Sequence, residues 1–187
     1  MATIDPLVPR YSAEVQRRFD AVTPPGAEPL LLFRVMAKSA RAWSKLVGGS
    51  LLDPGPLTLR QREIVIDRTC ALIGCEYEWG VHVALFAGAA GLQSAEIAAT
   101  VYGEASAPCW TPAESLLVAA ADALVARGKL NALEVAELKV HFSEEQIIEI
   151  IQLCGYYRTI GYLVGTFDLP LEEFGARFEK NSKPCGA

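Results

Sequence analysis

Apolar residues recur at three- and four-residue spacing along most of the chain, and the alternation typical of strands is scarce. Three segments begin with a capping-box pattern, in which a Ser or Thr is followed three residues later by Glu or Gln: Thr58, Thr111 and Ser143. After a short amphipathic segment before residue 24, the pattern predicts helices at 30–47, 58–74, 76–89, 94–101, 111–127, 130–142 and from 143 to about 164. The fold class predicted from this pattern is an all-α helical bundle.

Glycine and proline divide the chain into three parts. The stretches "PPGAEP" at 24–29 and "GGSLLDPGP" at 48–56 interrupt the helical pattern near the N-terminus. We therefore expect an N-terminal helical arm over residues 1–56, a main helical domain over 57–170 and a C-terminal tail over 171–187.

Composition narrows the classes of function. The chain has 187 residues, of which 51% are hydrophobic, and a net charge of −5 without a long basic run, which argues against nucleic-acid binding. No apolar stretch reaches the roughly 18 residues that a membrane span needs, and the N-terminus lacks the features of a signal peptide. We therefore expect a cytoplasmic protein that acts on a small-molecule substrate, with no membrane or nucleic-acid partner.

The five cysteines are scattered and form no Cys-x-x-Cys pair, so the chain does not look like a secreted disulfide framework. Cys75 has no cysteine three residues later, and we expect it to form no disulfide within its own chain. Cys70 and Cys185 are the candidates that would contradict this expectation, because Cys70 precedes the predicted turn and Cys185 lies in the tail.

One segment, "GCEYEWGVHV" at 74–83, concentrates polar residues within an otherwise apolar region. On a helix, Cys75, Glu78 and His82 stand at positions i, i+3 and i+7, and therefore share one face. Cys75 falls at the helix N-terminus, where the helix dipole favours a thiolate.

The preceding helix adds carboxylates to this cluster. Glu63 and Asp67 lie one turn apart, and a hairpin at residue 74 would bring Glu63 near Glu78 and His82. Burial and neighbouring charges shift the pKa values of such groups and suit them to general acid–base catalysis. Glu63, Glu78 and His82 could instead hold a divalent metal ion.

Each of these residues also has a purely structural interpretation. A cysteine on an apolar helix commonly packs as a small hydrophobe. A Glu–His pair at i, i+4 is often a solvated helix contact, and Glu63 near a helix start can simply complement the dipole. A non-catalytic protein whose polar cluster has lost its function is therefore an alternative.

Eleven residues separate Glu63 from Cys75, two separate Cys75 from Glu78, and three separate Glu78 from His82. This spacing of four residues resembles that of the alkylhydroperoxidase D-like superfamily, which includes the carboxymuconolactone decarboxylases. In the peroxidase branch of that superfamily the pattern is Glu, Cys, Cys, His, and the cysteine pair performs thiol–disulfide exchange. Here Glu78 replaces the second cysteine. The form "EWGVH" resembles the Glu-Trp-x-x-His of decarboxylase-like members.

This resemblance implies an alkylhydroperoxidase D-like helical fold that assembles as a homo-oligomer, a trimer or a hexamer. It favours a cofactor-independent, carboxymuconolactone decarboxylase-like lyase that binds no metal and acts on a small carboxylated lactone or related acid. Glu63, Cys75, Glu78 and His82 are then the catalytic candidates, with proton transfer assigned to Glu78 and His82. The alternative is a thiol-dependent hydroperoxidase that uses Cys75 with a distant or external resolving thiol.

Two further sets of residues carry weaker signals. Tyr156, Tyr157, Arg158 and Tyr162 form a polar-aromatic band on the last long helix. They either line the pocket, with Arg158 binding a substrate carboxylate, or serve ordinary packing. His141 stands at a helix end, where a histidine typically complements the dipole.

Overall fold

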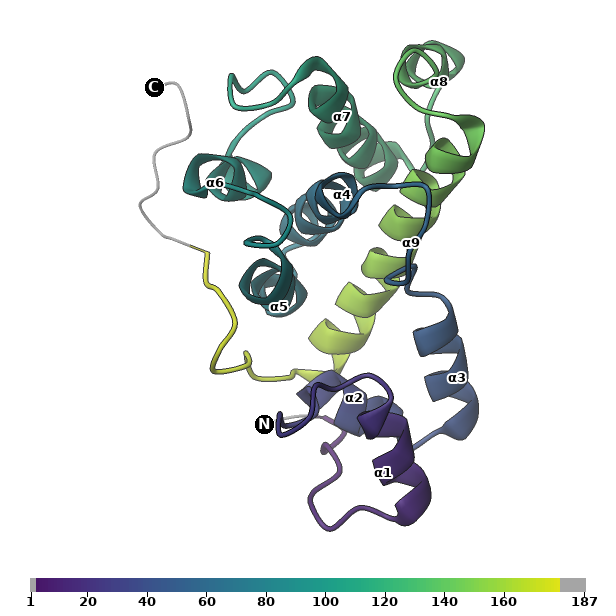
Figure 1. Ribbon diagram of the computed structural model, residues 1–187, viewed down its shortest axis with the longest axis vertical. Coiled ribbons are helices and arrows are strands. Elements are labelled where there is room, and N and C mark those ends of the chain that lie inside the picture. The colour runs from purple at the N-terminus through teal and green to yellow at the C-terminus, as the bar shows by residue number, and fades with distance from the viewer. Residues whose placement is uncertain (1–2, 179–187) are drawn as a thin grey trace.

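The computed structural model describes residues 3–178 and is entirely helical, which confirms the predicted all-α class. Within these residues the helices are α1 (Ala13–Asp20), α2 (Leu31–Met36), α3 (Ala40–Gly48), α4 (Leu59–Leu72), α5 (Glu76–Phe86), α6 (Ser94–Tyr102), α7 (Pro112–Arg127), α8 (Ala132–Leu138) and α9 (Glu144–Phe167). Figure 1 shows the bundle formed by α4 to α9, with α1 to α3 packed at one end of it.

Helix α4 forms the centre of the bundle. It packs against α5, α6, α7 and α9, and the eight residues from 63 to 70 are all buried. A helix covered on so many sides needs apolar residues around its whole circumference, or polar residues with buried partners. Helix α4 also carries buried charged side chains, so the helices around it must supply polar partners for them. The site lies where α5 supplies such a partner.

Local sequence signals fix most helix starts. Thr58, Thr111 and Ser143 each accept a hydrogen bond from the backbone N–H three residues on, and each capping box is complete. Gly74 adopts a φ of +70°, a conformation that glycine adopts without steric cost, between α4 and α5. The predicted hairpin between these two helices is therefore confirmed.

The predicted helix over residues 30–47 is wrong as a single element. The chain forms α2 and α3 instead, and Ser39 caps α3 by accepting a hydrogen bond from the backbone N–H of Ala42. The serine hydroxyl provides a local start signal that the apolar periodicity alone concealed. The helix predicted over residues 130–142 is also shorter, because α8 covers only Ala132–Leu138.

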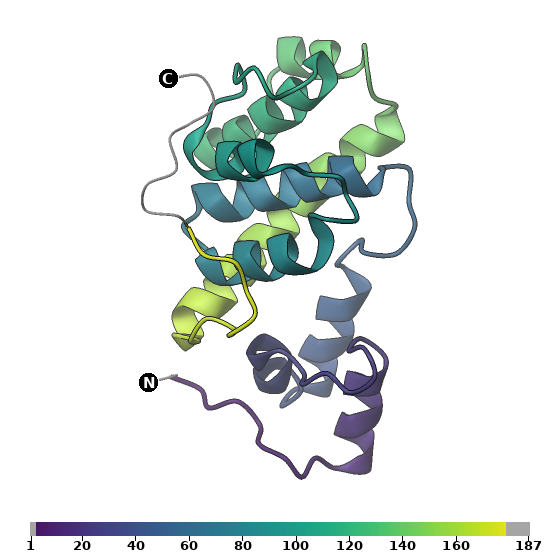
Figure 2. The same cartoon turned by 60° about the vertical axis from the view of Figure 1, so that its left-hand side comes forward.

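The N-terminal arm has a small apolar core of its own. Phe19, Ala37 and Trp43 are buried together, with Phe33 and Tyr11 packed around them. The ring of Phe19 contacts those of Trp43 and Tyr11 edge-on. Figure 2 shows α1, α2 and α3 as a separate group below the bundle.

After α9 the chain turns back, and residues 169–178, here called the C-terminal strap, run along α5 (Figure 1). The backbone N–H of Ala176 donates to the carbonyl of Gly80 at 2.9 Å, and Phe178 stacks on Trp79 with 4.9 Å between ring centroids. A Cβ at position 80 would stand 2.3 Å from the carbonyl oxygen of Ala176. Gly80 is therefore required by the close approach of the strap.

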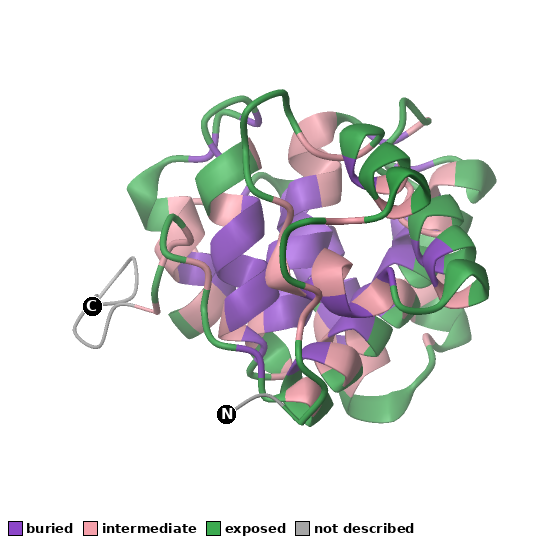
Figure 3. Cartoon of the chain, turned by 90° about the horizontal axis from the view of Figure 1, so that it is seen from below, coloured by how far each residue is buried: buried purple, intermediate pink, exposed green. Residues whose placement is uncertain are grey.

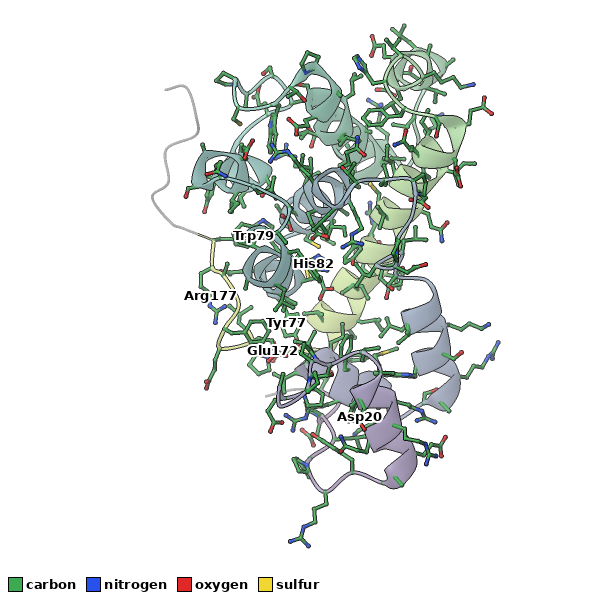
Figure 4. All side chains as sticks on the ribbon, viewed as in Figure 1. Asp20, Tyr77, Trp79, His82, Glu172 and Arg177 are labelled. Carbon is green, nitrogen blue, oxygen red and sulfur yellow. The ribbon has the colours of Figure 1, made fainter. Side chains whose placement is uncertain are left out.

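Glu172 of the strap joins three segments. Its Oε1 accepts hydrogen bonds from the hydroxyl of Tyr77 at 2.5 Å and from the backbone N–H of Leu31 at 2.6 Å. The hydroxyl oxygen of Tyr77 also accepts a hydrogen bond from the backbone N–H of Leu32 at 3.2 Å. Figure 4 shows Tyr77 and Glu172 close together, where α5, the strap and α2 meet.

Buried residues concentrate in the middle of the molecule, in α4 and the helices around it (Figure 3). None of the helices in residues 3–178 combines the length and the apolar character needed to cross a membrane. Cys185 lies outside the described residues.

Candidate functional site

The hairpin of α4 and α5 brings Glu63 and His82 into direct contact. Nδ1 of His82 lies 2.7 Å from Oε2 of Glu63, and both side chains are almost completely buried. Figure 4 shows His82 on the inner side of α5, between that helix and the rest of the bundle. The structure therefore brings together the pair that the hairpin predicted.

Glu78 lies on the other side of the same imidazole. Its Oε1 is 3.5 Å from Nε2 of His82, and its Oε2 is buried without a hydrogen-bond partner. His82 thus stands between two carboxylates, one on each ring nitrogen. Oε2 of Glu78 therefore has no hydrogen-bond donor among the described residues.

The surroundings keep the imidazole of His82 positively charged at neutral pH. Burial lowers the pKa of His82, but the hydrogen-bonding carboxylates of Glu63 and Glu78 and their charges outweigh burial and raise it to about 10. On the far side of the cluster, Nε of Arg62 donates to Oε1 of Glu63 at 3.0 Å. Basic and acidic side chains therefore alternate along Arg62, Glu63, His82 and Glu78.

Cys75 adjoins this cluster. It is the N-cap residue of α5 and is buried, and the structure records it as a free thiol. Burial raises the pKa of Cys75 to about 11, although a hydrogen bond from the backbone of Glu78 lowers it and the charge of Glu78 raises it further. Burial therefore opposes the thiolate form that the helix N-terminus favours.

A cavity of about 420 Å³ opens beside Glu78, between the N-terminal arm and the bundle. Its wall comes from α2, α3, α5, α9 and the segments after α1 and α3, and includes Leu32, Leu46, Tyr156, Tyr157 and Ile160. Of the four catalytic candidates, Glu78 alone belongs to the described wall of this cavity. A more open hollow of about 660 Å³ lies in the arm beside Asp20 (Figure 4) and contains no member of the cluster.

The polar-aromatic band of α9 divides into two groups. Tyr157 packs edge-on against His82 with 5.0 Å between ring centroids, and the hydroxyl of Tyr156 donates to the carbonyl of Leu46 at 2.8 Å. Arg158 instead donates to the carbonyl of Val125 and to the hydroxyl of Tyr162, beside a different hollow. The structure therefore places Tyr156 and Tyr157 at the site and Arg158 away from it, so Arg158 is not positioned to bind a substrate carboxylate there.

Asp67 is the buried acid whose role the sequence did not define. It lies one turn after Glu63, is 1% exposed, and neither carboxyl oxygen has a hydrogen-bond partner. Burial raises the pKa of Asp67 well above its usual value. The charge of His82 lowers this pKa and the charge of Glu63 raises it, but both effects are smaller than that of burial. Arg62 was missed altogether, and its position next to Glu63 in the sequence was the available signal.

The arrangement does not match a metal centre. No group of three or more His, Cys, Asp and Glu side chains in residues 3–178 has the geometry to hold a metal ion. Both ring nitrogens of His82 face carboxylates of Glu63 and Glu78, so neither is directed at a shared position where an ion would bind. His141, the other candidate histidine, is exposed at the end of the segment after α8.

Comparison with protein families assigns part of the chain to a known family. Residues 37–123 match the model of the carboxymuconolactone decarboxylase family. The segment 37–123 belongs to that family. The match begins inside the predicted N-terminal arm, and the division of the chain at residue 56 stays a prediction. No curated protein matches the chain.

Solved structures share the fold of the whole chain. An uncharacterised peroxidase-related protein from Silicibacter sp. TM1040 has a TM-score of 0.78 at 15% identity, covering 95% of this chain and 97% of its own. A debrominase has a TM-score of 0.73 at 18% identity, covering 92% and 93%. A protein from Agrobacterium tumefaciens, described as a putative antioxidant defence protein AhpD, has a TM-score of 0.65 at 20% identity, covering 72% and 93%. These similarities confirm the alkylhydroperoxidase D-like fold.

Proposed function

We propose that this carboxymuconolactone decarboxylase family protein is an enzyme that moves a proton to or from a small molecule held in the 420 Å³ cavity, as a cofactor-independent lyase requires. The observation that supports this proposal is the position of Glu78. Its unpartnered Oε2 belongs to a carboxyl group of the cavity wall, while its Oε1 faces the imidazolium of His82.

In this proposal Glu78 is the catalytic residue and His82 acts behind it. A proton from the substrate passes to the carboxyl group of Glu78, or from that group to a carbanion or enolate that bond cleavage leaves on the substrate. His82 keeps its own proton and stabilises the carboxylate form of Glu78 through its positive charge, and Glu63 holds the ring in place. A positioned acid or base of this kind is worth about 10²–10⁴-fold in rate.

The lyase interpretation differs in one respect from the sequence prediction, in which His82 donated the proton directly. His82 is 3% exposed and lies behind Glu78, whose side chain is 10% exposed. A proton that leaves His82 for the cavity would therefore have to pass through Glu78.

A thiol-dependent hydroperoxidase is the second candidate, because structural neighbours of this chain are named as peroxidase-related or antioxidant proteins. Another neighbour is a debrominase, whose variant was solved with 2,3,4-tribromopyrrole. Cys75 adjoins Glu78 in this chain and would be the nucleophile. Its raised pKa and its buried position favour the lyase interpretation instead.

A panel of carboxylated lactones, related small acids and organic hydroperoxides, assayed with three variants, distinguishes these functions. For a lyase, Glu78→Gln lowers kcat by at least about 10²-fold on any substrate that is turned over, Cys75→Ser retains most activity, and Glu137→Gln on the exposed face of α8 is the matched control. Loss of peroxide turnover in Cys75→Ser alone would establish the thiol chemistry instead. Turnover that is unaffected by both changes would refute both residue assignments, and no turnover throughout the panel would favour the non-catalytic alternative.

A further inference from the structure

The cavity beside Glu78 contains no cationic side chain in its wall. Its charged members among the described residues are Glu78, which is nearly buried, and Asp53, which is exposed. The remaining wall is apolar or aromatic apart from a serine, and it is built by residues such as Leu32, Phe33 and Ile160. A molecule that enters this cavity therefore meets an apolar wall and negative charge.

The cations of the cluster cannot serve a ligand in their place. His82 already has a carboxylate on each ring nitrogen. Nε of Arg62 donates to Glu63, and Nη1 donates to the carbonyl of Leu52 at 2.9 Å. Neither side chain belongs to the described wall of the cavity, and a carboxylate bound there would face Glu78 without a counter-charge.

The carboxyl group of Glu78, whose side chain is 10% exposed and belongs to the cavity wall, indicates what the ligand must supply. A buried acceptor without a donor costs free energy, and a hydrogen bond to a charged acceptor recovers more than one to a neutral acceptor. Tyr156 does not provide that donor, because its hydroxyl donates to the carbonyl of Leu46. A ligand with an O–H or N–H group next to an apolar ring would complete the site.

We propose that the cavity selects an uncharged, largely apolar ring compound that donates one O–H or N–H hydrogen bond to Glu78, and that it rejects compounds bearing a carboxylate. This inference rests on the proposed function, since it names the substrate class of the same site. It departs from the carboxylated lactone that the family resemblance favours.

Three fluorinated probes of similar size test the inference by ¹⁹F NMR at pH 7. The first, 4-fluorophenol, is uncharged and donates a hydrogen bond; 4-fluorobenzoate is an anion; and fluorobenzene has the ring alone. We expect wild-type protein to bind the phenol on the order of tenfold more tightly than the benzoate, and more tightly than fluorobenzene.

Two variants assign the effect to the cavity. Glu78→Gln keeps the shape of the side chain and removes its charge, so the preference for phenol over benzoate should fall to within about threefold. Glu137→Gln is the matched control and should leave that preference unchanged. Val47→Trp places a large ring at the partly exposed edge of the cavity wall and should weaken the binding of all three probes.

Benzoate binding as tight as phenol binding in the wild type would overturn the inference, as would a preference that survives Glu78→Gln or the failure of every probe to bind. The outcome is separate from that of the proposed function, because the probes report binding without turnover. Phenol selectivity with no Glu78-dependent catalysis would refute the proposed function alone. Glu78-dependent turnover together with benzoate preference would refute the substrate class alone.

Discussion

Replacing Glu63 by Gln tests whether the buried imidazole of His82 is charged. The substitution keeps the size of the side chain and removes the carboxylate that lies 2.7 Å from Nδ1. The pKa of His82 stands at about 10, raised from 6.5. Removing one adjacent opposite charge changes a pKa by roughly 1–3 units, so the pKa of His82 should fall by at least about one unit in Glu63→Gln.

The stability effect has a definite sign and pH window. A group whose pKa is higher in the folded state stabilises the fold fully below its unfolded value, and this contribution disappears as the pH rises through the folded value. For His82 that window runs from 6.5 to about 10. Each unit of difference corresponds to about 1.4 kcal/mol, so the whole shift represents a contribution on the order of 5 kcal/mol. Removal of one partner of a buried pair typically costs about 3–5 kcal/mol, which is of similar size.

Two measurements check this prediction. The chain has two histidines, so ring ¹⁵N signals of His82 can be assigned with a His141→Gln variant and followed with pH. Urea unfolding at pH 6 and pH 10.5 should show Glu63→Gln destabilised by several kcal/mol at the lower pH and by less at the higher pH. A neutral His82 ring in wild-type protein at pH 8, or an equal loss of stability at both pH values, would refute the reasoning.

Four further outcomes are expected. Asp67→Asn should leave stability unchanged near pH 3.8 and increasingly stabilise the protein as the pH rises, by more than about 1 kcal/mol at pH 7. The reason is that burial raises the pKa of Asp67 in the folded state, so ionisation in the unfolded state opposes folding. Urea unfolding at both pH values measures this effect. Gly80→Ala should cost about 1–3 kcal/mol and expose the C-terminal strap to proteolysis, whereas Gly155→Ala, where a Cβ meets open space, should stabilise α9 by about 0.5–1 kcal/mol. At pH 7 iodoacetamide should alkylate Cys75 at least about 100-fold more slowly than a model thiol, because its pKa lies near 11 rather than 9, and peptide mass spectrometry should find it outside any disulfide. Sedimentation at low micromolar concentration should show a homo-oligomer, a trimer or hexamer, and a stable species of 20.2 kDa would contradict this.

The sequence predicted the elements whose signals are local. The hairpin of α4 and α5 follows from the capping box at Thr58 and from Gly74, which adopts positive φ. Once that turn is placed, helical spacing brings Glu63 near Glu78 and His82, and in the structure an oxygen of each glutamate lies within 3.5 Å of a ring nitrogen of His82. The candidate cluster could therefore be predicted without knowledge of the rest of the bundle.

Features that depend on distant segments could not be predicted in this way. The burial that raises the pKa of Cys75 involves α9, since a Cβ at Gly161 would lie 3.6 Å from the Cβ of Cys75. The cavity likewise needs α2 and α3 against α9, and the periodicity merged these two short helices into one. Only the folded arm shows that Glu78 faces a cavity while His82 does not.

The density of unusual residues in α5 follows from the four different neighbours that surround this helix. Glu78 faces the cavity, and Trp79 donates from Nε1 to the hydroxyl of Thr100 on α6 at 3.0 Å. Gly80 lies under the C-terminal strap, and His82 returns to the interior of the hairpin. Because each neighbour demands a different side chain, "EWGVH" combines the catalytic candidates Glu78 and His82 with Trp79 and Gly80, which fix the helix against its neighbours. Substitution of Trp79 or Gly80 should therefore alter stability and the placement of Glu78 together, whereas Glu78→Gln should alter the chemistry while leaving the fold in place.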